Sequence, residues 1–250
     1  MKRIESIKNP KVKEWRKLHK RKDRDLTGTF FIEGFHLVEE GLKDKEMVNE
    51  IIITEEVSIP QHWKLDGINL TFVTTEIMKV ISETETPQGI AAVCKQKLAV
   101  HPLNWSKTLM IDAIQDPGNL GTLIRTADAA GIDGVLLGDG TVDVYNGKTI
   151  RASQGSIFHI PIMKGAIGKW LPSFSERKVP VYGTALEGGE PFNKIKSSKD
   201  FALIVGNEGS GVQQDLLKNT AANLYIPIYG EAESLNVAIA AGILLYHLRE

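Results

Sequence analysis

The stretch IQDPGNLGTLIRTADAAG, residues 114–131, decides the fold class. An apolar strand-like run ends here in a Pro117-Gly118 turn, and an amphipathic helical run follows at once. Such strand–turn–helix corners hold nucleotides in α/β proteins. The glycines do not fit GxGxxG, however, and there is no GK[ST]. We expect Asn119 to cap the helix, and we leave two readings open for Arg125: a surface pair with Asp128, or a cation aimed at a phosphate or reacting oxygen.

The sequence around this corner continues as strands that alternate with helices. Helical runs begin near Leu120, Asn146, Ile167 and Ser234. Nearly continuous apolar strands joined by helices predict a parallel sheet covered on both faces. The expected strands are TLMIDAI, GVLLG, FHIPI, VPVYGTA, FALIVG and NLYIPI.

Two further loops carry polar residues that packing explains poorly. In LIVGNEGSGV, residues 203–212, Glu208 stands in a glycine-rich loop after a strand. In IPIYGEAESLNVAIAAGILLYHL, residues 226–248, Ser234 can cap a helix, but Asn236 would be a buried amide in its apolar first turn. That helix is apolar almost all round, which predicts a core helix or a subunit interface.

The first 97 residues predict a separate, smaller α/β domain, followed by a linker over residues 98–105 and a second domain over 106–250. Residues 1–30 contain eleven Lys and Arg against four Asp and Glu, although the whole chain has a net charge of −1. This asymmetry indicates a nucleic-acid partner or a solvated basic helix over Lys11–Lys22, in which Trp15 and His19 offer stacking surfaces. The candidate RNA-binding residues are Lys11, Lys13, Arg16, Lys17 and Arg21.

The composition excludes several classes of protein. The single cysteine, Cys94, allows no internal disulfide or cysteine-based zinc site and is expected in a buried strand. The histidines show no HExxH or HxxxH spacing, so we expect no metal. The apolar C-terminal run is too short for a membrane span, and the N-terminus has no signal-peptide core. We expect a cytoplasmic protein.

Together, the three loops resemble the SpoU family of RNA ribose methyltransferases, within the SPOUT superfamily. DPGNLGTLIRTADAAG, LIVGNEGSGV and IPIYGEAESLNVAIAAG match the family's three motifs in order, and RASQG, residues 151–155, lies where members often have a similar segment. SIKNPKVKEWRKL, FFIEG and TPQGIAAV resemble, more loosely, the start, middle and end of an accessory substrate-binding domain found in the family.

The resemblance implies an α/β protein with a C-terminal trefoil-knotted methyltransferase domain, a small N-terminal RNA-binding domain, and a homodimer formed through the C-terminal domain. It implies S-adenosyl-L-methionine as cofactor and a ribose 2′-hydroxyl as methyl acceptor. Ribosomal RNA is the expected substrate, because the accessory domain is commoner among members that modify ribosomal RNA, and transfer RNA is the alternative. By position, the cofactor-binding residues are Thr184, Gly206, Asn207, Ile226 and Leu235.

The resemblance also assigns a catalytic group. Arg125 is proposed in the family as a base, but a guanidinium stays protonated in proteins, which suits a positive charge beside the forming oxyanion better. Its proton role stays open. The residues that would orient Arg125, the ribose or the cofactor are Asn119, Glu208, Ser234 and Asn236, and Arg151 would contact a phosphate.

Two other classes of protein are alternatives to an active ribose methyltransferase. An inactive RNA-binding or ribosome-assembly protein would not need all five catalytic residues together. A nicotinamide-dependent oxidoreductase would need the missing GxGxxG and an acid about 20 residues further on. Binding of S-adenosylmethionine, of no cofactor, or of a dinucleotide separates the three.

Overall fold

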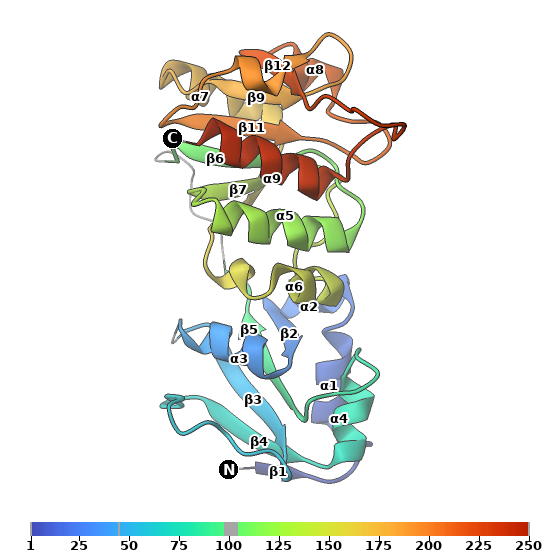
Figure 1. Ribbon diagram of the computed structural model, residues 1–250. Coiled ribbons are helices and arrows are strands. Elements are labelled where there is room, and N and C mark those ends of the chain that lie inside the picture. The colour runs from blue at the N-terminus through green and yellow to red at the C-terminus, as the bar shows by residue number, and fades with distance from the viewer. Residues whose placement is uncertain (1, 45, 98–104, 250) are drawn as a thin grey trace. The chain divides into compact units, whose positions relative to one another are not determined.

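The computed structural model describes residues 2–44, 46–97 and 105–249, which form two compact units (Figure 1). The N-terminal unit comprises the described residues of 1–97 together with 145–158, and the C-terminal unit comprises those of 98–144 and 159–250. Residues 98–104 of the expected linker lie outside the described residues, and Trp105 is buried in the core of the C-terminal unit.

The N-terminal unit is a mixed sheet with the strand order β1-β4-β3-β5-β2, in which β5 runs antiparallel to β3 and β2. Helices α1 and α4 pack on one face through Val12, Trp15 and Ile77, and Cys94 is fully buried in β5. The elements are β1 (Lys2–Ile4), α1 (Pro10–Lys17), α2 (Arg21–Thr27), β2 (Thr29–Glu33), α3 (Phe35–Leu42), β3 (Val48–Thr54), β4 (Asn69–Val73), α4 (Thr75–Ile81), β5 (Ile90–Lys95), α6 (Gly147–Ser153) and the 3₁₀ helix η1 (Ser156–Phe158).

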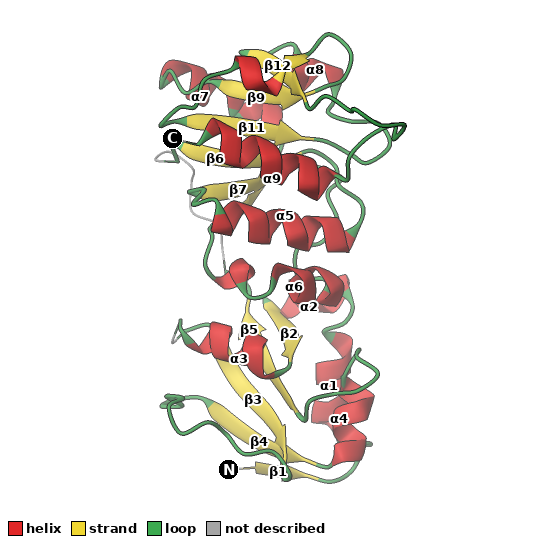
Figure 2. Cartoon of the chain, viewed as in Figure 1, coloured by secondary structure: helices red, strands yellow, loops and turns green. Residues whose placement is uncertain are grey.

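The C-terminal unit is an all-parallel sheet with the strand order β10-β12-β9-β11-β6-β7-β8, as the strand pattern predicts (Figure 2). The elements are β6 (Lys107–Ile111), α5 (Pro117–Ala129), β7 (Gly134–Leu137), β8 (Ile162–Lys164), η2 (Ile167–Lys169), α7 (Leu171–Glu176), β9 (Val181–Thr184), β10 (Glu190–Pro191), η3 (Phe192–Lys194), β11 (Phe201–Val205), α8 (Gln214–Leu217), β12 (Ala222–Tyr225) and α9 (Val237–Leu248).

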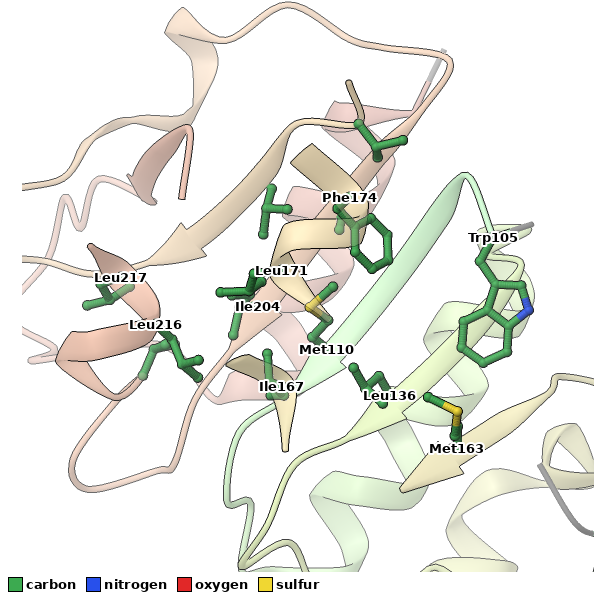
Figure 3. Close-up of a cluster of buried hydrophobic side chains, with 14 residues drawn as sticks. Trp105, Met110, Leu136, Met163, Ile167, Leu171, Phe174, Ile204, Leu216 and Leu217 are labelled. Atoms are coloured by element: carbon green, nitrogen blue, oxygen red, sulfur yellow. The ribbon is translucent and has the colours of Figure 1, made fainter. Parts of the chain in front are cut away.

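Alternating side chains of this sheet build a core on each face. Met110 and Ile204 point to one face, where they pack with Leu171 and Phe174 of α7 (Figure 3). Their neighbours along β6 and β11 point to the other face, which α5 and α9 cover. Each fully buried side chain of this size contributes about 1.5–3 kcal/mol of transfer free energy.

After β12 the chain returns to the middle of the sheet, where α9 packs on α5 and β11. This return brings the third sequence motif beside the first. The threading that would make it a trefoil knot stays a prediction. No helix in the described ranges is long and apolar enough to cross a membrane.

The basic segment differs from the single helix expected over Lys11–Lys22. It forms α1 and α2, with extended backbone at Lys20, because the buried series Val12, Trp15 and Leu18 has no apolar continuation in the next turn. The prediction that Trp15 offers a stacking surface is wrong, since its side chain is only 1% exposed and donates a hydrogen bond to Glu50 (3.1 Å).

The expected FHIPI strand is also displaced. Phe158 belongs to η1 and stacks on Phe30 in the N-terminal unit, so β8 begins only at Ile162. Tyr145, at the start of the same insertion, packs on Phe30 as well (ring centroids 4.6 Å apart). Residues 145–158 therefore leave the C-terminal sheet to complete the core of the other unit.

Candidate active site

The three sequence motifs meet at one edge of the C-terminal sheet. β6, β11 and β12 are parallel, so the loops that follow them leave the sheet at the same edge. α5 and α9 begin at this edge and run side by side in the same direction: Asn236 bonds Asn119 at their starts, and the Tyr246 hydroxyl donates to the Ala129 carbonyl near their ends (Figure 1).

Asn119 is not the helix cap that the sequence suggests. The Asp116 carboxylate caps α5 and accepts a hydrogen bond from the Asn119 backbone N–H (2.8 Å). Pro117 at the first helical position favours this start, because it needs no hydrogen-bond acceptor. The Asn119 side chain is thereby left free to reach across to the other two loops.

The Asn119 amide joins the second motif to the third. Its Nδ2 donates to Glu208 Oε1 (3.0 Å), and its Oδ1 accepts from Asn236 Nδ2 (2.9 Å). Asn236, rather than Ser234, caps α9, because its Oδ1 accepts the backbone N–H of Ala238 (2.9 Å). In this series of hydrogen bonds, each amide oxygen accepts and each amide nitrogen donates, so the orientation of both amides is fixed.

Glu208 ends this series of hydrogen bonds and fixes it to the backbone. Besides Asn119, its carboxylate accepts the backbone N–H groups of Gln115 (3.2 Å) and Asp116 (3.3 Å). Partial burial raises the pKa of the Glu208 carboxyl, but the hydrogen bonds from Asn119 and the backbone outweigh it and hold the pKa below its usual value. The acid in the glycine-rich loop therefore serves as an ionised acceptor.

This lowered pKa predicts a defined pH dependence for the Glu208→Gln variant. A carboxyl group whose pKa is lower in the folded than in the unfolded protein stabilises the folded state. This contribution is fully present when the pH is above the pKa of the unfolded protein, about 4.3 for Glu, and is lost as the pH falls through the pKa of the folded protein. We expect the variant to unfold at a lower temperature than the wild type at neutral pH, and the difference between the two unfolding temperatures to shrink progressively as the pH falls below about 4.3. Thermal unfolding from neutral pH to pH 3 checks this; a gap that stays constant with pH would contradict it.

The loop that carries Glu208 is tied back on itself. The backbones of Asn207 and Gly211 exchange two hydrogen bonds (3.0 and 2.9 Å), and Asn207 Nδ2 donates to the Ala113 carbonyl (2.8 Å). A Cβ on Gly206 would collide with the backbone of Gly211 and Val212. Gly206 is thus required by loop closure, and the Asn207 side chain is fully used inside the protein.

Arg125 is exposed on α5, away from the buried face. The surface pair with Asp128 is not formed, because Asp128 instead contacts His159 (3.0 Å). Within residues 2–44, 46–97 and 105–249, the Arg125 guanidinium has no hydrogen-bond or ionic partner. Long helical side chains lean toward the helix N-terminus, which aims this cation toward the Asn119 end of α5.

The expected cofactor residues lie at the carboxyl ends of neighbouring strands. Thr184 ends β9, Gly206 follows β11 and Ile226 follows β12. The Thr184 hydroxyl donates to the Ile204 carbonyl, so these residues can offer a ligand mainly backbone groups and apolar contact. Leu235 is 36% exposed on the loop before α9.

Apolar side chains also protrude from the adjoining loops. Tyr229 is 95% exposed in the loop after β12, and Leu186 is 63% exposed in the loop after β9. Exposed apolar side chains at this edge suit contact with an adenosyl group. Ser234 is exposed, and its hydroxyl has no partner among the described residues.

No group of three or more His, Cys, Asp or Glu side chains that could hold a metal ion occurs among the residues that the structure describes.

The substrate-binding candidates all lie in the N-terminal unit. Arg151 is on α6, where its Nη1 lies 3.3 Å from Glu83 Oε2. Lys11 pairs with Glu50 and Arg21 with Asp25. In the basic segment from α1 to α2, the exposed Lys and Arg side chains with no partner among the described residues are Lys13, Arg16, Lys17, Lys20 and Lys22.

Three residues that support the site, Asp112, Ala113 and Gln115, were not identified from the sequence. The Asp112 carboxylate, 1% exposed, accepts hydrogen bonds from the backbone and side chain of Gln213 (2.8 and 2.6 Å). Gln115 Nε2 donates to the carbonyls of Gly140 (2.6 Å) and Ala113, and Ala113 has a left-handed backbone (φ 56°). An acid inside the apolar run TLMIDAI was the available signal for Asp112.

Comparison with known proteins agrees with this geometry. The model of the SpoU rRNA Methylase family matches residues 106–246, and that of the MRM3-like substrate binding domain matches residues 9–92. The chain is 55% identical over 252 residues to 23S rRNA (guanosine(2553)-2′-O)-methyltransferase RlmP of Bacillus subtilis, with 100% of both chains covered.

Two solved structures share the fold over nearly the whole length. One is an AdoMet-bound rRNA methyltransferase from Sinorhizobium meliloti (TM-score 0.87, 33% identity, covering 99% of this chain and 97% of that one). The other is an RNA 2′-O ribose methyltransferase (TM-score 0.84, 28% identity, covering 98% and 97%). With its three motifs joined at one edge of an all-parallel sheet, the chain belongs to the SpoU rRNA methylase family.

Proposed function

We propose that this protein transfers the methyl group of S-adenosylmethionine to the ribose 2′-oxygen of a guanosine in 23S ribosomal RNA, the reaction in the name of its Bacillus subtilis relative. The observation that carries the proposal is the series of hydrogen bonds Asn236–Asn119–Glu208 at the start of α5. The same helix presents Arg125, which has no partner among the residues that the structure describes. The cytoplasm, where ribosomal RNA is made and modified, is the expected compartment.

The residues of this edge perform distinct tasks. Bound S-adenosylmethionine supplies an electrophilic methyl group. The positively charged guanidinium of Arg125 stabilises negative charge on the ribose oxygen and holds the adjoining phosphate. Asn119 and Asn236, whose amides are fixed by Glu208 and by α9, set the position of the α5 end against which the ribose is aligned.

Methyl transfer in vitro tests this function. Purified protein is incubated with tritiated S-adenosylmethionine and with 23S ribosomal RNA or transfer RNA from a strain that lacks this protein. We expect label in ribosomal RNA, in one nucleotide, on the ribose. Label in transfer RNA instead would select the transfer RNA alternative. No label together with no binding of S-adenosylhomocysteine would select the inactive RNA-binding protein.

The exposed Lys and Arg side chains of α1 bind the phosphates of the RNA. Replacing Lys13, Arg16 and Lys17 together by Gln is expected to weaken RNA binding and to reduce the slope of log K against log salt by up to about 2–3, because each lost phosphate contact removes roughly 0.7–0.9. Filter binding at several salt concentrations measures both quantities.

A control variant separates this local effect from net charge. Replacing the exposed Lys194, Lys196 and Lys199 of the C-terminal unit by Gln removes the same three charges from another surface. Its RNA affinity should stay near that of the wild type. Equal losses in the two variants would contradict a footprint on α1.

The apolar face of α9 supports a homodimer as part of the proposal. Ile239 and Tyr246 are each 58% exposed, and Ile243 joins them on the same side of the helix. The helix is therefore not buried on all sides within one chain, which favours a subunit interface over a core helix, the two alternatives that its apolar sequence leaves open. Analytical ultracentrifugation at micromolar concentration is expected to find a two-chain species, and a single-chain species would contradict the dimer.

A further inference from the structure

A group of aromatic side chains lies at the surface of the N-terminal unit, apart from the basic α1. Phe35, at the start of α3, faces Trp63 from the loop between β3 and β4, with ring centroids 6.1 Å apart and planes inclined by 55°. Both Trp63 Nε1 (3.2 Å) and His62 Nε2 (2.7 Å) contact Glu39 Oε1 on the next turn of α3. We call Phe35, Glu39, His62 and Trp63 the α3 aromatic cluster.

This cluster stays open to solvent. Phe35 and Trp63 are half-buried and His62 is exposed, in contrast to the fully buried Trp15. Hydrogen bonds from His62 and then Trp63 lower the pKa of the Glu39 carboxyl, which keeps it an ionised acceptor. Glu39 Oε1 takes both bonds, which leaves Oε2 without a partner among the described residues.

A lysine follows the aromatic pair in the sequence. Lys64 follows Trp63 directly, is exposed, and has no ionic partner in the described ranges. Aromatic faces bind unpaired bases by stacking, and a neighbouring cation holds the phosphate that links such a base to the next. A carboxylate oxygen can accept the N–H groups on a base edge, which paired bases in a helix have already used.

We propose that the α3 aromatic cluster binds one unpaired base of the RNA substrate. The base stacks on the Trp63–Phe35 surface, its N–H edge faces Glu39, and its phosphate lies at Lys64. This inference rests on the proposed function for the identity of the RNA. It assigns the N-terminal unit two kinds of contact: phosphates along α1, and a base at α3.

Tryptophan fluorescence reports the stacking directly. Trp15 and Trp105 are 1% and 7% exposed, so a Trp170→Phe variant leaves Trp63 as the accessible indole. We expect its emission to be quenched by a single-stranded 23S rRNA fragment centred on guanosine 2553, and to change little with a fully paired RNA duplex of the same length. Equal quenching by the duplex, or RNA binding with no quenching, would overturn the base site.

Substitution of Trp63 measures what the stack contributes. Trp63→Ala is expected to weaken binding of the same fragment roughly 5- to 100-fold, as for the loss of one stacked base, whereas Trp63→Phe keeps a ring and should stay within about threefold. If Trp63→Ala unfolds, the Trp63→Phe and Lys64→Gln variants replace it, and only the latter should weaken binding.

Two outcomes distinguish this inference from the proposed function. If the wild-type protein transfers methyl groups to ribosomal RNA and Trp63→Ala binds that RNA as tightly as the wild type, the base site would be overturned and the proposed function would stand. A wild-type protein that neither binds nor methylates ribosomal RNA would overturn both.

Discussion

Replacing Arg125 by Ala is expected to lower the rate of methyl transfer by roughly 10²–10⁴-fold, the range for losing a charged group that acts on the reacting oxygen. The fold should not change, because the side chain is exposed and has no partner among the described residues. Substitutions at such surface positions usually change the free energy of unfolding by less than about 0.5 kcal/mol. Single-turnover methylation and thermal unfolding measure the two effects.

Arg125→Lys serves as the matched control. It keeps one positive charge but loses the planar fork that can hold a phosphate and a ribose oxygen together. We expect it to recover only part of the lost rate. Substantial turnover by Arg125→Ala, with the rate reduced less than about tenfold, would remove Arg125 from the centre of the mechanism.

Asn119→Ala is expected to cause the second-largest loss, roughly 10²–10³-fold in the rate constant at saturating substrate. The change removes the shared link between the second and third motifs, so that Glu208 Oε1 and Asn236 Nδ2 both lose a partner. Affinity for S-adenosylhomocysteine, measured by calorimetry, should also fall, because Glu208 and Asn236 belong to the loops of the expected cofactor residues.

The chain of hydrogen bonds makes two checks possible. Asn119→Asp places a second carboxylate about 3 Å from Glu208, where like charges repel, and should be at least as damaging as Ala. The double variant Asn119→Ala/Asn236→Ala should lose much less than the sum of its single losses in activation free energy, because both break the same chain. Strict additivity would show that the two amides act independently.

The sequence predicted the parallel sheet and its motifs because these depend on local patterns. Apolar strand runs and helical periodicity locate β6, β9, β11 and α5, and burial of Cys94 follows from its apolar surroundings. The unusual polar residues were informative in the same way. An acid in a glycine-rich loop and an amide at an apolar helix start had no role in packing, and both contribute to the site.

What the sequence missed depends on contacts between distant segments. Asp116 replaces Asn119 as cap because Asn119 is drawn to Glu208, 89 residues away. Phe158 leaves the expected strand because it stacks on Phe30 within the N-terminal unit, 128 residues earlier in the chain. Ala113 adopts a left-handed backbone in which its carbonyl accepts a hydrogen bond from Asn207. No local propensity encodes these pairings.

Mapping ribose methylation in a deletion strain tests the central claim most directly. 23S ribosomal RNA is isolated from the parent strain, from a strain that lacks this protein, and from that strain supplied with the wild type or with Arg125→Ala. The account predicts one ribose methyl group, at the guanosine equivalent to 2553, that disappears in the deletion, returns with the wild type and stays absent with Arg125→Ala. Unchanged methylation at that guanosine in the deletion strain would contradict it.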